Sequence, residues 1–594
     1  MSEGSSTSGS RKLSWWWLAV LFAAVLPSAG TLSAPLISDD GAILGYVAEN
    51  GALSDWTTSQ YDLRSVRFWR PLVTTSFAVQ EALTGVESLP LRLFNLLGHA
   101  ASALLLGLLA TRLGAGRLGA LLAGLLCAWF PEQGGNVTWI AGRVDSQCVP
   151  FILLACLLAL DDRRILALVA GFLALGAKEL AVVIPLWIAL LAWGRGDSLG
   201  AAIRRALPLA GVVLLVGIWR RLALGTWVGG YPSQGLSADR LEALANSATA
   251  FGAALAPELI AIAVVLLLTR STGWAKRTLA LVGCSIVAAA PLLHLLSGGS
   301  VPLEHARTLW LADAALALAL GSSFGAQAPS LSKLRRNLGV LGLVAVMVLA
   351  AHRGELARID VLDWSKGAEQ AEREVQAVRD ELAQENESLA PVVSSNFTRI
   401  TESGAYVLHW GIADRFRAPF EKSARPVWPW RPVIEVAGPN TFRELLFEIA
   451  GGVGYPIDER GRQAAKLEVR RADGEPLGVL SVLSSFAIQG AELDPSPRLA
   501  AQLDPALASP AAWELLFICE LGYRVVRLDT PSRELKLSVR EALLAVEDVF
   551  LLAVDFRAER GFLELRAVAG DGEVLASSSW IELAWEREEL LSAE

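Results

Sequence analysis

The chain has 594 residues, of which 53% are hydrophobic, and a formal net charge of −8 at pH 7. This composition is too apolar for an ordinary soluble protein, and the chain is too long for a single domain. The acidic balance and the lack of a basic stripe argue against nucleic acid as a partner. Five cysteines occur singly, mostly in apolar stretches, so we expect neither a disulfide framework nor a zinc site.

The apolar residues are concentrated before residue 352, which divides the chain in two. We predict a cytoplasmic N-terminus at 1–14, a transmembrane domain at 15–352 and an extracytoplasmic soluble domain at 353–594. The expected fold class is a polytopic α-helical membrane protein with about eleven transmembrane helices, followed by an α+β domain. After the first span at 15–37, the spans lie near 89–111, 118–131, 145–160, 164–177, 180–194, 207–224, 248–269, 278–297, 305–323 and 337–352.

The first span is uncharged, and Arg11 and Lys12 before it mark the cytoplasmic side. Asp39 and Asp40 follow it directly. Carboxylates at a membrane boundary suit a general base that deprotonates a hydroxyl arriving from the aqueous side. The alternative is an aspartate that caps the N-terminus of a helix beginning with GAILGYVAEN, and the pair alone does not decide between the two.

A large loop at 38–88 carries amphipathic aromatic residues, Tyr61 and Trp69 among them, that favour the bilayer interface. Within this loop, FWRPLVTTSFAVQEAL has apolar residues at near-helical spacing, and Pro71 is suited to the first position of a helix. We therefore expect an interfacial helix with Arg70 at its start.

The positive charges between spans test the topology, because cytoplasmic loops carry an excess of lysine and arginine. One side receives Arg112, Arg117, Arg163, Arg164, Arg204, Arg205, Lys276, Arg277, Lys333, Arg335 and Arg336. This distribution predicts a cytoplasmic N-terminus and a C-terminal domain on the opposite side.

Five cations map to the opposite, outer boundary, which positive charge normally avoids. They are Arg70, Arg143, Lys178, Arg220 and Arg307. Such side chains stabilise the charge that develops on a departing lipid phosphate. The alternative for each is a snorkelling side chain or an ion pair, with Lys178 and Glu179 as the obvious pair.

Three further polar residues lie in or beside the spans. Asn95 and His99 are one helical turn apart, and His99 binds either a substrate or a neighbouring helix; both alternatives stay open. Asp145 lies two residues beyond Arg143, and we expect it to orient that arginine.

Together these motifs resemble the GT-C glycosyltransferases, in particular the transmembrane O-mannosyltransferases and their bacterial relatives. The shared motifs are found here at Asp39–Asp40, Arg70–Pro71, Asn95 with His99, Pro131 through Asp145, Lys178–Glu179, Arg220 through Tyr231 and, more weakly, Arg307. The resemblance covers residues 36–231 and is faint from there to about 352. The family's Arg-Tyr-Leu-Tyr run is Arg307-Thr-Leu-Trp here, and residues 353–594 show no tetratricopeptide repeat, which leaves the acceptor open.

The resemblance implies an integral membrane glycosyltransferase that takes a sugar, mannose in the best-known case, from a polyprenyl-phosphate donor. The acceptor would be a hydroxyl of a protein, glycan or lipid outside the cytoplasm, with Asp39 as the general base and Asp40 supporting it. Substrate-binding roles are implied for Arg70, Asn95, His99, Arg143, Asp145, Lys178, Glu179, Arg220 and Arg307. No cofactor or metal is evident, a divalent cation stays open, and the bacterial inner membrane is the expected location.

Two alternatives come from other classes of protein. A transporter or flippase of lipid-linked sugars would place charges near the bilayer midplane and repeat its halves. A membrane-anchored assembly or binding protein would keep its function in the outer domain.

The soluble part begins with a predicted surface helix at 355–385. Beyond it, VIEVAG, KLEVRR, YRVVRLDT, FLELRAVAG and SSWIELAW alternate between apolar and polar residues and predict strands. TFRELLFEIAG and PAAWELLFICELG predict helices.

Overall fold

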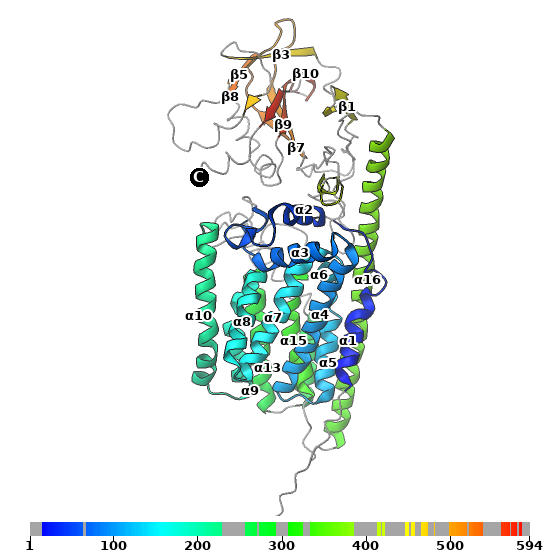
Figure 1. The fold of residues 1–594 in the computed structure, drawn as a ribbon, viewed down its shortest axis with the longest axis vertical. Helices are drawn as coiled ribbons and strands as arrows, with labels where there is room; N and C mark the ends of the chain where they lie inside the picture. The colour runs from blue at the N-terminus through cyan, green and yellow to red at the C-terminus, as the bar shows by residue number, and fades with distance from the viewer. Residues whose placement is uncertain are drawn as a thin grey trace, which may run out of the picture.

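The computed structural model describes most of the helical part and the strands of the second part. The described residues are 15–37, 39–62, 67–227, 256–269, 272–292, 307–324, 333–384, 413–416, 418–421, 446–450, 453–457, 465–472, 480–481, 498–519, 522–538, 560–570, 572–578 and 581–584. Figure 1 shows a bundle of long helices, with the strands grouped beyond one of its ends.

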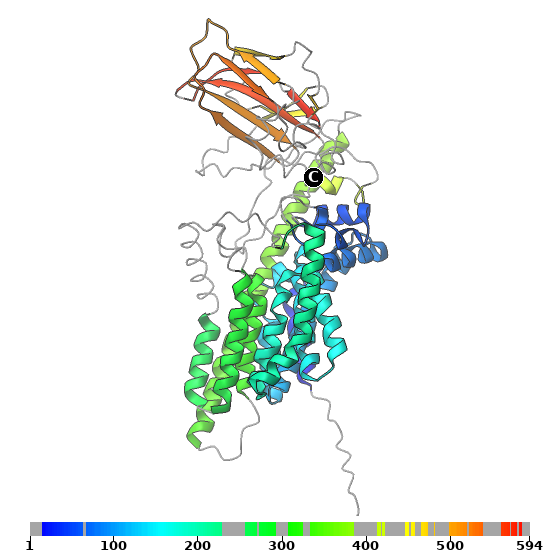
Figure 2. The same ribbon diagram turned by 90° about the vertical axis from the view of Figure 1, so that its left-hand side faces the viewer.

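The bundle is built from apolar helices that run side by side (Figures 1 and 2). They are α1 (Trp16–Val25), α4 (Ser88–Arg112), α5 (Arg117–Ala128), α7 (Arg143–Leu160), α8 (Arg164–Ala177), α9 (Ile184–Arg195), α10 (Leu199–Leu224), α12 (Ala256–Thr269), α13 (Thr272–Ala289), α15 (Trp310–Ser323) and α16 (Lys333–Gln384). Helices satisfy their own backbone hydrogen bonds, which a chain in hydrocarbon requires. In α15 every residue from Trp310 to Ser322 is buried, so this helix lies in the core of the bundle.

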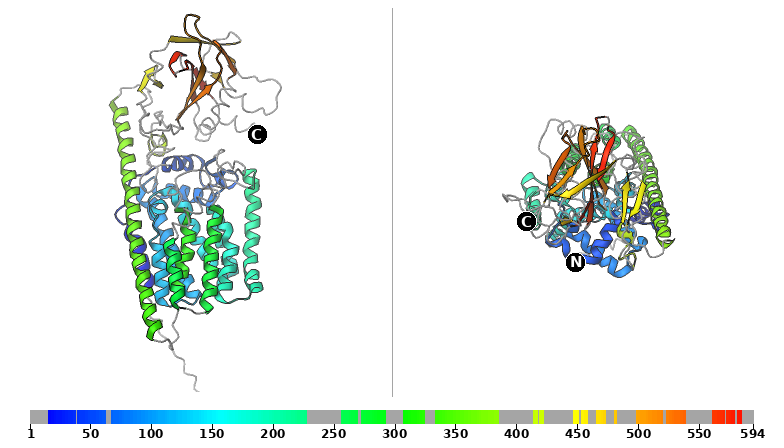
Figure 3. Two further views of the ribbon diagram at one scale, coloured as in Figure 1. Left: turned by 180° about the vertical axis from the view of Figure 1, so that it is seen from behind. Right: turned by 90° about the horizontal axis from the view of Figure 1, so that it is seen from above.

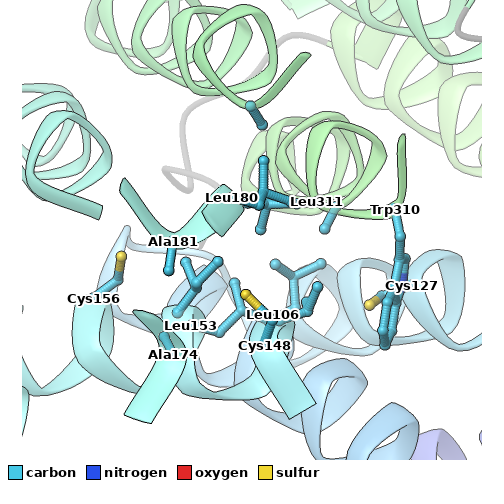
Figure 4. Close-up of a cluster of buried hydrophobic side chains, with 14 of the residues drawn as sticks. Leu106, Cys127, Cys148, Leu153, Cys156, Ala174, Leu180, Ala181, Trp310 and Leu311 are labelled. Carbon is cyan, nitrogen blue, oxygen red and sulfur yellow. The ribbon is translucent and has the colours of Figure 1, made fainter. Parts of the chain in front are cut away.

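Leucine, alanine and cysteine side chains fill the core. Figure 4 shows Cys127, Cys148 and Cys156 among leucines and alanines of neighbouring helices. These three and Cys284 are free and buried. In such a setting a thiol acts as a small apolar side chain.

Four stretches of the described chain are long and apolar enough to cross a membrane: Ser88–Arg112, Ile140–Leu160, Leu199–Leu224 and Val340–Arg373. The protein is thus an integral membrane protein, and the count of about eleven helices stays a prediction. The first span differs from the expected continuous helix over 15–37. Helix α1 ends at Val25, and a 3-10 turn, η1 (Leu26–Ser28), follows at Pro27, whose ring removes a backbone donor.

Two helices lie across one end of the bundle, α2 (Asp40–Asn50) and α3 (Pro71–Thr84) (Figure 1). We call this the site end. The expected helix is confirmed, since Pro71 occupies its first turn and Arg70 is its N-cap residue, and its place at the membrane interface stays a prediction. Asp55 joins the two helices by accepting hydrogen bonds from the Tyr46 hydroxyl at 2.8 Å and from the Thr74 hydroxyl.

The opposite end of the bundle, which we call the basic end, holds the arginines assigned to the cytoplasmic side. Arg112 pairs with Asp161 at 2.7 Å, and Arg205 pairs with Asp162 at 2.5 Å. These pairs link the ends of α4 and α10 to the turn between α7 and α8. The grouping agrees with the predicted topology, whose direction across the membrane stays a prediction.

Helix α16 has 52 residues and continues past the site end (Figure 3). The predicted span at 337–352 and the predicted surface helix at 355–385 are therefore parts of one helix. Its apolar first half belongs to the bundle, and its charged second half leads toward the strands.

The second part of the chain forms antiparallel and mixed sheet. A large sheet has the strand order β4-β11-β9-β10-β3-β5-β8, with β6 paired to β9 and β7 paired to β6. Its strands are β3 (Ala465–Arg471), β4 (Leu480–Ser481), β5 (Arg498–Gln502), β6 (Ala512–Cys519), β7 (Gly522–Leu528), β8 (Glu534–Ser538), β9 (Arg560–Val568), β10 (Val574–Ser578) and β11 (Ile581–Ala584), and a separate pair joins β1 (Leu446–Ala450) and β2 (Val453–Ile457).

Both helices predicted for this part are wrong where the structure describes them, because LFEIA forms β1 and AWELLFIC forms β6. Strand β6 lies between β7 and β9, and residues on both of its faces, Leu515 and Leu516 included, are buried. A strand buried on both faces has a continuous apolar run, which periodicity does not separate from a buried helix. The strands expected at KLEVRR, YRVVRLDT, FLELRAVAG and SSWIELAW are found, and VIEVAG lies outside the described residues.

Candidate active site

The acidic pair lies where α2 begins, at the site end. Asp39 is the N-cap residue of α2, but its side chain makes no capping hydrogen bond. Asp40 is fully buried, and its Oδ2 accepts a hydrogen bond from the Ile37 amide at 2.9 Å. Burial raises the pKa of Asp40 to about 7, against the lowering effects of the Ile37 amide and the Arg92 charge. The half-buried Asp39 is thus the more accessible carboxylate of the two.

Arg92 holds the chain around this pair. Its fully buried side chain donates to the carbonyl of Thr138 at 2.7 Å, to that of Pro35 at 2.5 Å and to that of Ala34. It therefore fastens the segment before the acidic pair to the turn that precedes α7. The sequence analysis missed Arg92, although it lies three residues before Asn95 and so on the same face of α4.

Arg143 opens α7 and is fully buried. Its guanidinium donates to Asn95 Oδ1 at 3.2 Å and to Gln80 Oε1 at 2.6 Å, and it lies 3.8 Å from the centre of the Phe77 ring. Asn95 also donates to the Ile140 carbonyl at 3.2 Å. The amide of Asn95 thus orients Arg143.

Two expectations about ion pairs are wrong. Lys178 Nζ binds Asp145 Oδ1 at 2.6 Å in a buried pair, so Asp145 does not orient Arg143. Glu179 pairs with Arg70 at 3.1 Å instead of with Lys178. Lys178 has extended backbone at the end of α8, and the neighbouring side chains of an extended backbone point in opposite directions.

Arg70, Glu179 and Arg220 form a group with a net positive charge. Burial acts to raise the pKa of Glu179, but the charges of Arg70 and Arg220 hold it below its usual value. The Nε and Nη2 atoms of Arg220 are buried and make no hydrogen bond with any described residue. Two guanidinium groups share one carboxylate, which leaves one positive charge uncompensated.

Tyr61 lies in the segment between α2 and α3, at the site end. The charges of Arg70, Arg143 and Asp39 all act on its hydroxyl, and burial and Asp55 raise its pKa. Its φ of 57° lies in the left-handed region, which is rare for a non-glycine residue and often marks a functional site. From the sequence, Tyr61 was only one aromatic residue of the interfacial loop.

Arg307 contacts the turn that precedes α7 and includes Trp139. Its guanidinium is 4.1 Å from the centre of the Trp139 ring, and the other face of that turn meets α16. There Trp139 stacks with Trp364 at 5.5 Å, and the Gly134 amide donates to Asp360 Oδ2 at 2.6 Å. Helix α16 therefore contacts the turn that leads into Arg143.

His99 lies within the bundle and contacts neighbouring helices. Its Nε2 is 2.9 Å from the Ala128 carbonyl of α5, and its ring stacks on Trp310 of α15 at 4.9 Å. Of the two alternatives for His99, the structure shows the contact with a neighbouring helix.

The described residues hold no group of three or more His, Cys, Asp or Glu side chains arranged to bind a metal ion. The site is instead a set of carboxylates and guanidinium groups at one boundary of an integral membrane protein.

Comparisons with known proteins agree with the resemblance seen in the motifs. No protein-family model matches the chain. Protein O-mannosyl-transferase Tmtc1 of Drosophila melanogaster is 30% identical over 203 residues, which cover 28% of this chain and 23% of Tmtc1. The chain thus spans about a quarter of the length of this relative. The resemblance to the O-mannosyltransferases is confirmed for the matched part of the chain.

A search of solved structures gives ArnT from Cupriavidus metallidurans, in a crystal structure bound to undecaprenyl phosphate. The similarity has a TM-score of 0.43 at 12% sequence identity, and it covers 67% of this chain and 86% of ArnT.

Proposed function

We propose that the protein is a membrane glycosyltransferase that moves a sugar from a polyprenyl-phosphate donor to a hydroxyl acceptor at the site end. The observation that carries this proposal is that Asp39, Arg70 and Arg143 lie at the starts of α2, α3 and α7, at the same end of the bundle, where Arg143 also binds Gln80 of α3. A base and cations at one membrane boundary are what this transfer needs. The name of Tmtc1 makes mannose the first sugar to test.

In the proposed reaction Asp39 takes the proton of the acceptor hydroxyl as its oxygen forms a bond to the anomeric carbon of the sugar. The bond from that carbon to the phosphate oxygen breaks, and polyprenyl phosphate leaves with the electron pair. Asp39 suits the base because it is half-buried, whereas the carboxyl of Asp40, whose pKa is about 7, holds a proton for part of the time at neutral pH.

The departing phosphate binds beside Arg70 and Arg220 in this proposal. Their shared carboxylate leaves a positive charge for a lipid phosphate, and the orphaned nitrogens of Arg220 are donors for its oxygens. Arg143 already donates to Asn95, Gln80, Ser76 and the Leu91 carbonyl, so in this proposal it acts through its charge and by holding α3 against α4.

The test is a transfer assay with the purified full-length protein in proteoliposomes. Polyprenyl-phosphate mannose and glucose, labelled in the sugar, are supplied with an acceptor extract, and the released polyprenyl phosphate is measured beside the transferred label. We expect transfer from a lipid donor. Transfer from a nucleotide sugar without a lipid donor would exclude the mechanism.

A further inference from the structure

A pocket lies at the basic end, at the other end of the bundle from the candidate active site. It occupies about 380 Å³ between α8 and α10 and is closed on one side by the end of α7. Its floor is made of small and apolar residues, Ala159, Ala167 and Leu209 among them. Arginines of two helices, Arg164 and Arg204, line it.

Helix packing explains why the pocket forms. Glycine at position 171 lets α8 approach α10 closely, since a Cβ atom there would lie 2.4 Å from Leu209 Cδ1. Toward the basic end, the facing surfaces of α8 and α10 carry alanines, Ala167 and Ala201, whose small side chains leave space between the two helices. The pocket therefore lies between the two helices at the basic end, which the topology predicts to face the cytoplasm.

The charges in the pocket are not balanced. Arg205 is neutralised, because it binds Asp162 at 2.5 Å, lies 3.4 Å from an Asp197 oxygen and donates to the Ala159 carbonyl at 2.7 Å. The side chains of Arg164 and Arg204 are exposed, and their guanidinium groups make neither an ion pair nor a hydrogen bond with the part of the chain that the structure describes. Two uncompensated guanidinium groups thus line one concave surface, which is the arrangement that binds phosphate oxygens.

The surroundings favour a lipid over a soluble phosphate. Beside the arginines, apolar side chains of both helices are exposed: Ile165 at 78%, Leu166 at 52%, Ile203 at 47% and Leu207 at 57%. In a membrane these faces lie against acyl chains. A headgroup bound by the arginines would therefore have its chains on an apolar surface, and basic pockets between helices on this side bind anionic headgroups.

We propose that this pocket binds the headgroup of an anionic phospholipid from the cytoplasmic leaflet. Arg164 and Arg204 bind the phosphate, Arg205 and Asp162 form the rigid wall, and the acyl chains lie on the exposed faces of α8 and α10.

Detergent-solubilised, delipidated full-length protein tests this by titration with short-chain phosphatidylglycerol, short-chain phosphatidylcholine and glycerol 3-phosphate. We expect saturable binding of phosphatidylglycerol, at least tenfold weaker binding of phosphatidylcholine and no saturable binding of glycerol 3-phosphate. Equal affinity for the two lipids would overturn the proposal. Binding of glycerol 3-phosphate as tight as that of phosphatidylglycerol would overturn it too, in favour of a soluble phosphate.

The double variant Arg164→Gln/Arg204→Gln should bind phosphatidylglycerol about thirtyfold more weakly, since two basic residues are lost. The matched control is Arg117→Gln/Lys276→Gln, which removes the same charge from the basic end outside the pocket and should change affinity less than twofold. We expect both variants to keep the fold, which the melting temperature checks, because three of the changed side chains are exposed and Lys276 is half-buried with its Nζ 4.9 Å from the centre of the Trp193 ring. Equal weakening in the two variants would show general surface charge and overturn the site.

Discussion

Asp39 and Asp40 are adjacent but have different surroundings. One is half-buried at the start of α2, and the other is fully buried beneath it. We predict that Asp39→Asn lowers turnover by roughly 10²-fold, the usual contribution of a general base, while the protein stays folded. Glu49→Gln, an exposed acid on the same helix, is the control and should keep normal turnover. Near-normal turnover of Asp39→Asn would remove it as the base.

Asp40 gives a prediction about pH. In the folded protein burial raises its pKa to about 7, whereas in the unfolded chain it ionises near 3.8. Between about pH 4 and pH 7 the folded state holds a proton that the unfolded state has lost, so the free energy of unfolding falls as pH rises through this window. Asp40→Asn removes this dependence. Its melting temperature relative to the wild type should rise from pH 4 to pH 8; a constant difference would contradict the burial argument.

The variant Tyr61→Phe removes the hydroxyl and keeps the ring, so it distinguishes the role of the one from that of the other. The variant keeps the edge contact with Tyr46, whose ring centre is 5.5 Å away. It loses only the hydroxyl, on which the charges of Asp39, Arg70 and Arg143 act. We expect turnover to fall about tenfold or more with an unchanged melting temperature. Tyr46→Phe is the matched control: it loses a hydrogen bond to Asp55, which should cost about 1 kcal/mol of stability. If the two variants had the same turnover, Tyr61 would be structural.

At the scale of elements, the contact of α4 with α7 depends on Gly98. A Cβ atom there would lie 2.0 Å from the Ser146 carbonyl oxygen, and backbone yields less than a side chain does. Gly98→Ala should therefore destabilise the bundle by about 1–3 kcal/mol, the usual cost of overpacking. Gly211→Ala on α10 has open space and should be neutral or slightly stabilising. The melting temperatures of the two purified variants check this prediction. Equal melting temperatures would contradict the close packing of α4 on α7 at Gly98.

The helices of the bundle were predictable from the sequence, whereas the ion pairs at their ends and one central strand were not. The apolar runs predicted α4, α7 and α8 nearly to the residue, because a hydrocarbon surrounding permits little besides a helix. The partners of Asp145 and Glu179 were not predictable, since the connection between α8 and α9 decides which way each side chain points. In the second part, β6 was mistaken for a helix because its partners β7 and β9 bury both of its faces.

For the whole molecule, the topology predicts which positions a membrane-impermeant thiol reagent reaches. Four native cysteines are buried and should react slowly, and Cys519 is replaced by serine. A cysteine at Leu83, which is 79% exposed on α3, should be labelled in intact cells, and one at Arg163 only after permeabilisation. The reverse pattern would place the site end in the cytoplasm.

Helix α16 has a mechanical consequence for the molecule. Its 52 residues make a rod of about 78 Å, while a hydrocarbon core is about 30 Å thick. No proline interrupts it, and near its outer end Arg379 binds Glu421 at 2.8 Å, so a tilt imposed at that end is transmitted along the helix. Asp360 and Trp364 of α16 contact the turn that includes Gly134 and Trp139, and Arg307 lies against the Trp139 ring. A force on the outer half of α16 would therefore first change the angle between this helix and that turn.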